Sequence, residues 1–342
     1  MRIGILGCGH IAEKMAATLA DMPEMRYAAA ARELSRAREF ASRYGFAKAY
    51  GSYLELLEDK NVDLVYIATP HSFHYEHARL AIEHGKAVLC EKSFMLNARQ
   101  TEEIFALAKE KEVFITEAIW TRYMPFSLKL KEIVDSGLIG HPQLLYASLA
   151  YPISHKERLV KPELGGGALL DVGVYTVHFA RMMFGGEIES ISGQAVLNSA
   201  GMDMQDAFSF RYSDGRIANL QCSALCSNDR QGIVSGDKGY LVIDNINNPL
   251  EARLYNPDHE LLETFTAPAQ ITGFEYQVRA CEDALERGLK ESPYIPHAET
   301  LAVMRLMDSL RASWGVVFPG ENAGGKVSDG EGRRRSDAGG AY

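Results

Sequence analysis

Three side chains with acid-base chemistry recur along one otherwise apolar run in the middle of the chain. Asp171, Tyr175 and His178 stand at positions i, i+4 and i+7 of the run 168–184. At that spacing a helix directs all three side chains the same way. A carboxylate, a phenol and an imidazole aligned together are typical of a proton-transfer site, whereas a lone tyrosine is usually a half-buried core residue. We therefore predict that this helix carries catalytic groups.

A charged pair, Glu91 and Lys92, follows the apolar run 87–90. Burying a lysine charge there without a purpose is costly. Either Glu91 forms a salt bridge with a helix, or Lys92 is a positioned cation near the nicotinamide. Such a cation can polarise a substrate oxygen or lower the pKa of a neighbouring acid.

The chain begins MRIGILGCGHIA, a short apolar strand followed by a glycine-rich turn and a helical run. Gly7 allows the tight turn, Gly9 lets the backbone approach a pyrophosphate, and Ala12 takes the third small position. The free N–H groups at the helix start would hold the phosphates. This context favours a dinucleotide site over an ordinary turn, and the residues predicted to bind the dinucleotide are Gly7, Cys8, Gly9, His10 and Ile11.

The second predicted strand, 27–31, ends beside two arginines. An enzyme that uses NAD places an acidic residue at this point to hold the ribose 2′-hydroxyl. Here Ala31 is followed by Arg32, and Arg36 lies a helical turn later. Guanidinium groups suit a 2′-phosphate, so we predict NADP rather than NAD, although Glu33 could still serve NAD.

The strand predicted at 64–68 runs into a segment rich in histidine. We predict that Thr69, Pro70 and His74 approach the cofactor, with His71 as an alternative to His74. A metal is rejected because His71, His74 and His77 would fan around a helix axis, and no zinc-type motif accompanies them.

The order of predicted elements divides the chain into two architectures. Strands alternate with helices up to about residue 121, which indicates an α/β unit, a Rossmann doubly wound parallel sheet. An α+β domain with a large, mostly antiparallel open sheet is predicted for 122–319, and a disordered tail for 320–342. The predicted strands are 2–6, 27–31, 64–68, 87–90, 113–116, 144–150, 188–197, 207–212, 216–225, 240–244 and 251–255; the predicted helices are 12–20, 35–44, 53–57, 73–84, 98–110, 168–184, 276–287 and 299–313.

The composition is that of an ordinary globular chain, with 46% hydrophobic residues and a formal net charge of -9. This charge argues against a nucleic-acid surface. The sequence also lacks a signal peptide and an apolar run of membrane-spanning length, so we expect a cytoplasmic protein without a membrane partner. The five cysteines form no Cys-x-x-Cys pair and are interpreted as reduced thiols.

Together these motifs resemble the glucose-fructose oxidoreductase / inositol dehydrogenase / MocA family. The resemblance rests on the glycine-rich start, on Cys90-Glu91-Lys92, on the GGGxLxDxGxY pattern from Gly165, and on the turn 234–240; it covers residues 1–319. The segments 117–123 and 291–296, with Tyr175 where many members have histidine, resemble the branch of dimeric dihydrodiol dehydrogenases and NADP-dependent D-xylose dehydrogenases. Ser93 stands where the family has proline.

The resemblance implies that Lys92 and Tyr175 lie at the reacting centre, that Asp171 supports them, and that Trp120 lines the substrate pocket. On this basis we predict that Lys92, held by Glu91, lowers the pKa of Tyr175 so that Tyr175 takes a hydroxyl proton, and that Asp171 orders Lys92 or binds a substrate hydroxyl. Arg122, Tyr151 and His178 are further predicted pocket residues, and the loops 151–161 and 198–205 are predicted to shape the pocket.

The predicted activity is hydride transfer between NADP(H) and the carbinol or carbonyl carbon of a sugar, a polyol or a cyclic trans-diol. Two alternatives stay open, a catalytically silent NAD(P)-binding regulatory protein of the same fold and an NAD-linked inositol-type dehydrogenase. An open sheet commonly pairs with a copy of itself, which predicts a homodimer through the second domain.

Overall fold

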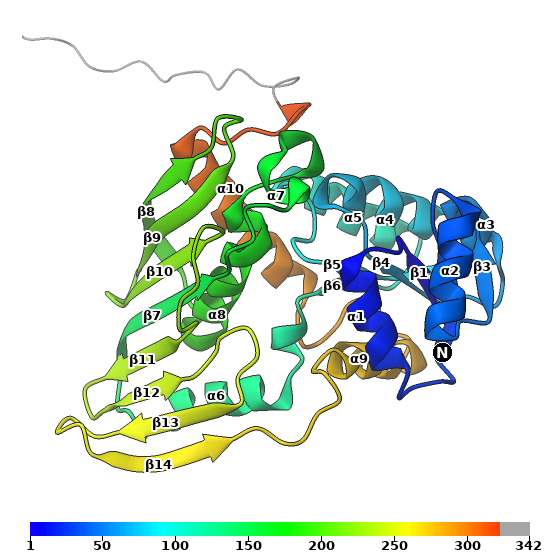
Figure 1. Cartoon of the computed structure of the whole chain (residues 1–342). Helices are drawn as coiled ribbons and strands as arrows, with labels where there is room; N and C mark the ends of the chain where they lie inside the picture. The colour runs from blue at the N-terminus through cyan, green and yellow to red at the C-terminus, as the bar shows by residue number, and fades with distance from the viewer. Residues whose placement is uncertain (322–342) are drawn as a thin grey trace, which may run out of the picture.

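The first sheet is parallel and is built from strands that are apolar along their length, as expected for strands covered on both faces. The computed structural model describes residues 1–321, and the strand order of this sheet is β3-β2-β1-β4-β5-β6 (Figure 1). Its elements are β1 (Ile3–Leu6), α1 (His10–Leu19), β2 (Arg26–Ala30), α2 (Leu34–Tyr44), β3 (Lys48–Tyr50), α3 (Tyr53–Glu58), β4 (Leu64–Ile67), α4 (His74–Glu83), β5 (Ala87–Glu91), α5 (Ala98–Glu110) and β6 (Ile115–Ala118).

The predicted Rossmann architecture is confirmed. From β1 the chain first adds β2 and β3 on one side of the sheet and then adds β4, β5 and β6 on the other. The order of strand addition therefore reverses between β1 and β4, which are parallel neighbours in the sheet although β2 and β3 separate them in sequence. Ligands of such sheets bind beyond the carboxyl ends of the strands at this reversal point. The segments after β1, β4, β5 and β6 therefore meet at one edge.

The second sheet has the strand order β14-β13-β12-β11-β7-β10-β9-β8 and is antiparallel except for the β7–β10 pair. The predicted open sheet is thus confirmed, although β11, β14 and the helix α6 were not predicted. The elements are α6 (Pro125–Asp135), β7 (Pro142–Ala150), α7 (Glu157–Val160), α8 (Val174–Phe184), β8 (Ile188–Leu197), β9 (Asp203–Tyr212), β10 (Ile217–Ser223), β11 (Gly232–Gly236), β12 (Tyr240–Ile243), β13 (Glu251–Tyr255), β14 (Leu261–Thr266), α9 (Glu275–Glu286) and α10 (His297–Trp314).

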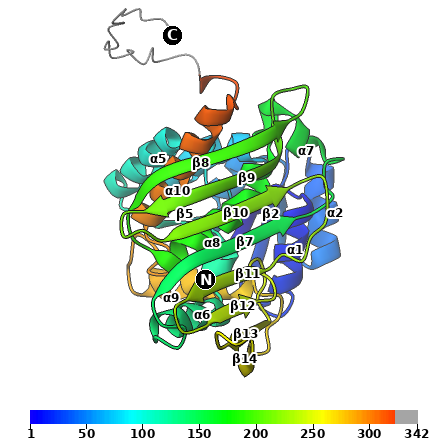
Figure 2. The same ribbon diagram turned by 90° about the vertical axis from the view of Figure 1, so that its left-hand side faces the viewer.

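One face of this sheet is packed and the other is open. Along β9, Met204, Phe208 and Phe210 point inward and are buried, while Gln205 and Arg211 point outward and are exposed. The helices α8 and α10 cover the inner face, and Figure 2 shows the outer face with no helix in front of it.

The last two helices return to the first sheet, so contacts cross the predicted boundary at residue 121. The amino group of Met1 lies 3.6 Å from the carboxylate of Glu282 in α9, and the backbone N–H of Ile115 donates to the backbone carbonyl of Lys290 at 3.2 Å. Helix α10 packs along α5. No helix among residues 1–321 combines the length and the apolar character needed to cross a membrane.

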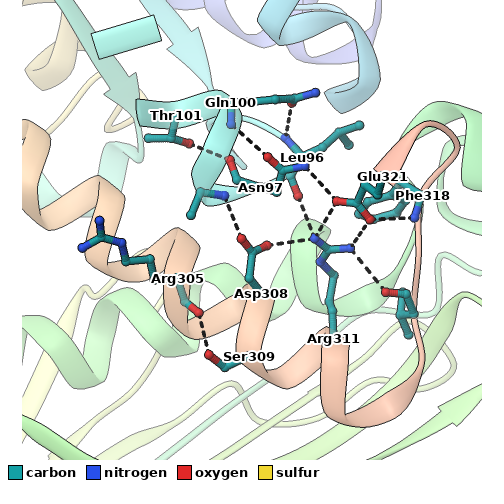
Figure 3. A network of polar contacts seen from close by, with 12 residues as sticks. Leu96, Asn97, Gln100, Thr101, Arg305, Asp308, Ser309, Arg311, Phe318 and Glu321 are labelled. Carbon is teal, nitrogen blue, oxygen red and sulfur yellow. Dashed lines mark hydrogen bonds and ion pairs between the residues drawn. The ribbon is translucent and has the colours of Figure 1, made fainter. Parts of the chain in front are cut away.

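A buried arginine joins α10, the start of α5 and the end of the described chain (Figure 3). The Arg311 guanidinium is 4% exposed and donates to Glu321 at 3.0 Å through each of its two terminal nitrogens, and to Asp308 at 2.8 Å. Glu321 also accepts from Asn97 at 2.8 Å, at the N-terminus of α5. Burial opposes ionisation of Glu321, but its hydrogen bonds and the Arg311 charge outweigh burial and lower its pKa.

Glu321 therefore belongs to the packed second domain rather than to the predicted tail. The segment just before it also packs: Val316 and Phe318 form a small apolar cluster with Leu96, Leu170 and Met202. The remainder of the predicted tail, 322–342, lies outside the described residues.

We expect Glu321→Ala in the full chain to lower the free energy of unfolding by about 1–3 kcal/mol, because it removes one acidic partner of a buried guanidinium. Urea denaturation followed by circular dichroism measures this loss. Glu110→Ala, which removes a carboxylate that is 68% exposed, is the matched control. Equal unfolding midpoints for the two variants would contradict the role given to Glu321.

Candidate active site

A cleft of about 1020 Å³ opens at the carboxyl edge of the first sheet, where the second domain faces it. The segments after β1, β4, β5 and β6 all contribute to its wall, as the strand order requires. The predicted site residues that line it are Gly9, His10, Ile11, Thr69, Pro70, Glu91, Lys92, Trp120, Tyr151, Asp171 and Tyr175.

The first turn has the backbone shape that a phosphate site needs. Gly7 has φ +93°, in the left-handed region, and a Cβ there would lie 3.1 Å from the carbonyl oxygen of Ala68. A Cβ on Gly9 would meet nothing within 4 Å, so the backbone faces open space at the start of α1. Gly9 caps α1 without a side-chain hydrogen bond, which leaves the first N–H groups free for a pyrophosphate. Cys8 does not line the cleft, and burial raises its thiol pKa to about 11.

The two arginines lie outside the cleft but at the expected strand end. Arg32 and Arg36 are exposed after β2, next to buried Ala31. Both are close enough to Tyr53 to oppose the rise in its pKa that burial causes. Within residues 1–321 neither guanidinium forms a salt bridge with a carboxylate. The pair is therefore available to an added anion.

The three histidines have different surroundings and do not line the cofactor site as a set. His74 is fully buried and contacts the carbonyl oxygens of Ser93 at 2.9 Å and Thr69 at 2.8 Å, so its predicted contact with the cofactor is not found. His71 lines the cleft, and burial lowers its pKa to about 3. His77 contacts Thr69 Oγ1 at 3.0 Å. Among the described residues no group of three or more His, Cys, Asp or Glu is placed to hold a metal ion.

Lys92 bridges the two parts of the molecule. Its Nζ donates to the backbone carbonyl of Asp171 at 2.6 Å and lies 3.3 Å from Asp171 Oδ1. Arg158 Nη1 lies 2.8 Å from the same Oδ1. Burial alone would raise the pKa of Asp171, but the charges of Lys92 and Arg158 outweigh it and hold that pKa well below its usual range. Asp171 is therefore ionised, and it orders Lys92.

Glu91 acts on the Lys92 backbone, not on its ammonium group. Glu91 Oε2 accepts from the Lys92 N–H at 3.2 Å, and the other carboxylate oxygen accepts from the buried Tyr66 hydroxyl. Burial raises the pKa of Glu91 to about 7, against the lowering effects of Tyr66 and Lys92. The predicted pairing of Glu91 with the Lys92 charge is replaced by the pairing with Asp171.

Ser93 ties this loop to the second domain. The Lys92–Ser93 peptide bond is cis. The Ser93 hydroxyl donates to the carbonyl of Leu170 at 2.7 Å, one residue before Asp171. A proline could not form this hydrogen bond, so the serine adds a contact that holds Lys92 over the helix.

The Tyr175 hydroxyl faces the cleft beside an indole. Trp120 Nε1 donates to it at 3.1 Å, and Trp120 stacks on Phe274 with 4.6 Å between ring centroids. Lys92 Nζ lies 5.1 Å from the centroid of the Tyr175 ring. Burial, followed by the charge of Glu91, raises the pKa of Tyr175 well above its usual value. The predicted net lowering of the Tyr175 pKa is therefore not found in this structure: burial outweighs the groups that favour the phenolate, and Tyr175 is a neutral phenol.

The helix that carries these groups starts with a wider turn than the sequence predicted. Residues 169–173 form a π-helical turn before α8 begins at Val174. This turn lies between Asp171 and Tyr175, whereas Tyr175 and His178 are three residues apart within α8 and so about 60° apart around its axis. Asp171 and Tyr175 reach the cleft, whereas His178 is buried 3.4 Å from Glu117.

Arg122 does not reach the cleft either. Its Nη1 lies 3.6 Å from Glu299 and donates to the His178 carbonyl at 3.4 Å. Arg122 and His178 therefore support the site from behind and are not pocket residues.

Two buried acids support the π-helical turn from the second sheet. Asp203 Oδ2 accepts from the Leu169 N–H at 2.6 Å. Asp206 accepts from the Cys222 thiol at 3.0 Å, and burial with the neighbouring Asp203 charge raises the Asp206 pKa to about 9. Burial also raises the pKa of Asp203, so neither acid of this pair ionises as readily as a free carboxyl group.

Several cleft residues escaped the sequence analysis. Of the two loops predicted to shape the pocket, 151–161 lines the cleft and 198–205 does not. The cations of 151–161 were not singled out, although basic residues in a predicted pocket loop were a visible signal. The asparagines lie in a loop that contains no recognisable motif. The residues missed are Lys14, Lys156, Arg158, Arg230, Asn245, Asn247, Asn248, Thr272 and Phe274.

The cleft thus joins a backbone cradle for phosphates to a neutral phenol that is hydrogen bonded to an indole and lies beside an ordered ammonium group. Such an arrangement can exchange a proton with a substrate oxygen while a dinucleotide occupies the other end.

The comparisons with known proteins agree with this geometry. The sequence profile described as "Oxidoreductase family, NAD-binding Rossmann fold" matches residues 1–118, and that of the GFO/IDH/MocA C-terminal domain matches residues 127–242. Trans-1,2-dihydrobenzene-1,2-diol dehydrogenases from Mus musculus and Homo sapiens are each 34% identical to the chain, over 93% of it and 98% of their own lengths.

Among solved structures, a 3-ketoreductase from Actinomadura kijaniata in complex with NADP and TDP-benzene has a TM-score of 0.82 at 27% identity. The match covers 91% of this chain and 97% of the ketoreductase. The two sequence profiles and the relatives that are 34% identical indicate the same family. The chain belongs to the GFO/IDH/MocA family of NAD(P)-dependent oxidoreductases.

Proposed function

We propose that this dehydrogenase transfers hydride between NADP(H) and the carbinol or carbonyl carbon of a sugar, a polyol or a cyclic trans-diol. The observation that carries the proposal is the Tyr175 hydroxyl, hydrogen bonded to Trp120 and facing the same cleft as the Gly9 turn. The names of the relatives support this substrate range, since they are dehydrogenases of a cyclic trans-diol.

A nicotinamide bound in the cleft supplies or accepts the hydride. Tyr175 holds the proton: its neutral phenol donates to the oxygen of a carbonyl substrate, and the reverse reaction returns the proton to it. Trp120 Nε1 donates to the phenol oxygen, so the phenol hydrogen is free to point at the substrate. The Lys92 charge stabilises the phenolate left after transfer, and Asp171 fixes Lys92 in place.

The proposed cofactor is NADP, with Arg32 and Arg36 binding its 2′-phosphate. Their exposure at the end of β2 and their lack of acidic partners among the described residues support this choice. A neighbouring structure of the same fold also contains NADP. Glu33 remains the residue that would serve NAD.

The alternative of a silent regulatory protein is disfavoured by the site itself. A protein that only sensed NAD(P) would have no use for an ammonium group ordered by a buried carboxylate beside a phenol. An NAD-linked inositol-type enzyme is disfavoured by Arg32 and by tyrosine at position 175. Cytoplasmic location stays a prediction from the sequence.

We also propose that the outer face of the second sheet forms a homodimer. Leu144, Ile217 and Val196 leave apolar surface on that face, each at least 39% exposed. An isologous contact between two such sheets would bury them. Sedimentation equilibrium of the chain should give twice its mass of 37.8 kDa, and Ile217→Asp should shift the balance toward the monomer. A monomer at micromolar wild-type concentration would contradict the proposal.

We expect Tyr175→Phe to lower turnover on the order of 10²-fold or more with little change in NADP+ affinity, because it removes the proton carrier but not the phosphate cradle. Lys92→Met should be similarly damaging. The double variant should be scarcely worse than the worse single variant, since groups that act as one unit are non-additive. Steady-state kinetics with NADPH formation as the readout measures all three.

Tyr75→Phe, on the outer helix α4, is the matched control for loss of one phenol hydroxyl. If Tyr175→Phe keeps near-normal turnover and a normal pH profile, the proton carrier lies elsewhere, with Lys92 the first group to examine.

We expect Arg32→Ala to weaken NADP+ binding about tenfold or more while NAD+ binding changes little, because the arginine meets a phosphate that NADP alone carries. Arg38→Ala removes an exposed guanidinium from α2, the helix that follows Arg32, and serves as the control. Fluorescence titration with NADPH and NADH measures both affinities. Equal losses for the two cofactors would assign Arg32 a merely structural role.

A further inference from the structure

The wall of the cleft contributed by the second domain is polar and carries cations. Tyr151, Arg230, Asn245, Asn247 and Asn248 line it. Across the cleft, Trp120 stacked on Phe274 provides an apolar platform. Amide groups opposite an aromatic platform suit a molecule with hydroxyl groups on one side and C–H groups on the other, as a sugar ring has.

Asn247 has one side-chain atom without a protein partner. Its Nδ2 donates to the Tyr151 hydroxyl at 3.0 Å, while its Oδ1 is buried and accepts no hydrogen bond within the described residues. An unsatisfied buried acceptor costs free energy that a donor restores. A substrate O–H fits this need, and the same amide aligns Tyr151 for the substrate.

Arg230 is held in one place next to this amide. Its backbone has φ 62°, uncommon for a residue other than glycine, and its carbonyl accepts from the Ile246 N–H at 2.9 Å. Its guanidinium carbon lies 5.5 Å from the centroid of the Tyr151 ring. Such backbone conformations cluster at ligand sites, where surrounding contacts hold them. The Arg230 backbone is thus held by surrounding contacts, and its guanidinium lies against Tyr151 in the wall of the cleft.

The acidic groups of the cleft are already engaged. Asp171 serves both Lys92 and Arg158, and Glu91 is bound to Tyr66 and to the Lys92 backbone. Among residues 1–321, Arg230 forms no salt bridge with a carboxylate, and neither does Lys156.

Lys14 also lines the cleft without a carboxylate partner among the described residues, so three cations remain. Lys14 belongs to α1, on the side where the cofactor pyrophosphate is expected, and Lys156 lies near Arg158, Asp171, Lys14 and Lys92. Arg230 packs against the ring of Tyr151, whose hydroxyl accepts from Asn247. Arg230 is therefore the cation next to the unsatisfied amide.

We infer that the substrate is a sugar bearing an anionic group, a carboxylate or a phosphate, which Arg230 binds while Asn247 accepts from a ring hydroxyl. This inference rests on the proposed dehydrogenase function and narrows its substrate class. A planar guanidinium matches the paired oxygens of either anion. A neutral dihydrobenzene diol would leave the Arg230 charge unpaired.

A matched series of sugars tests the inference, because its members differ at one carbon only. D-glucose, D-glucuronate and D-glucose 6-phosphate are compared by kcat/KM at saturating NADP+. We expect the preferred charged sugar to exceed glucose about tenfold or more, with an advantage that shrinks as salt is added. Which of the two charged sugars is preferred identifies the anion as carboxylate or phosphate.

Variants assign the effect to the residue. Arg230→Gln should reduce the ratio of charged to neutral kcat/KM about tenfold or more, and Arg230→Lys should restore part of it. Arg287→Gln, which removes an exposed guanidinium of the Arg287–Asp283 pair outside the cleft, should leave the ratio unchanged.

Two outcomes overturn the inference alone: a wild type that binds NADPH but prefers glucose or trans-dihydrobenzene diol to both charged sugars, and a ratio that Arg230→Gln does not alter. Failure of the wild type to bind NADPH, measured by fluorescence, would instead overturn the proposed function itself.

Discussion

The arrangement of the site depends on one buried charge, the ammonium group of Lys92. It extends from the end of β5 in the first sheet to the backbone carbonyl and the carboxylate of Asp171 in the second domain, and the two side chains are 13% and 7% exposed. A cation in such surroundings is stable only with a close, oriented anion, and losing either partner would strand the other. The ion pair therefore fixes how the two domains meet, and with it the distance between the phosphate cradle and Tyr175.

The π-helical turn that presents Asp171 is held in place by contacts that Leu169 and Leu170 make with three other parts of the chain. Ser93 donates to Leu170 from the lysine loop, Asp203 accepts from Leu169 on the sheet side, and Leu170 packs in the cluster with Phe318. The last of these contacts depends on the chain end that Arg311 and Glu321 hold in place. A wide turn has weaker internal hydrogen bonding than an α-helix, so external partners of this kind are what keep its side chains in register.

Much of the fold could be predicted from the sequence because local signals were strong. The bounds of α5 were predicted without error, and its start carries the Asn97 side chain as a cap on Gln100. The site was harder. Asp171 and Tyr175 were found from helical spacing, but the same spacing placed His178 in the cleft, because periodicity cannot reveal that another element, here Glu117 of β6, covers that part of the helix face. Arg158 and Arg230 depend on loop paths, and β11 depends on pairing with the distant strand β7, neither of which a local pattern specifies. The edge strand β14 is exposed along most of its length and therefore lacks the alternation that predicts a half-buried strand.

The raised pKa of Tyr175 bears on the direction of proton transfer. A phenol buried near Glu91 stays protonated at neutral pH, which makes it ready to donate to a carbonyl oxygen. Accepting a proton from an alcohol requires the phenolate, and the groups that stabilise it are the Trp120 N–H at 3.1 Å and the Lys92 charge beside the ring. Trp120 therefore does more than line the pocket, since it donates to the one oxygen whose charge changes. Burial disfavours the phenolate that alcohol oxidation requires, and the indole N–H and the ammonium group oppose this effect of burial. Asp171 contributes by holding the ammonium group in place.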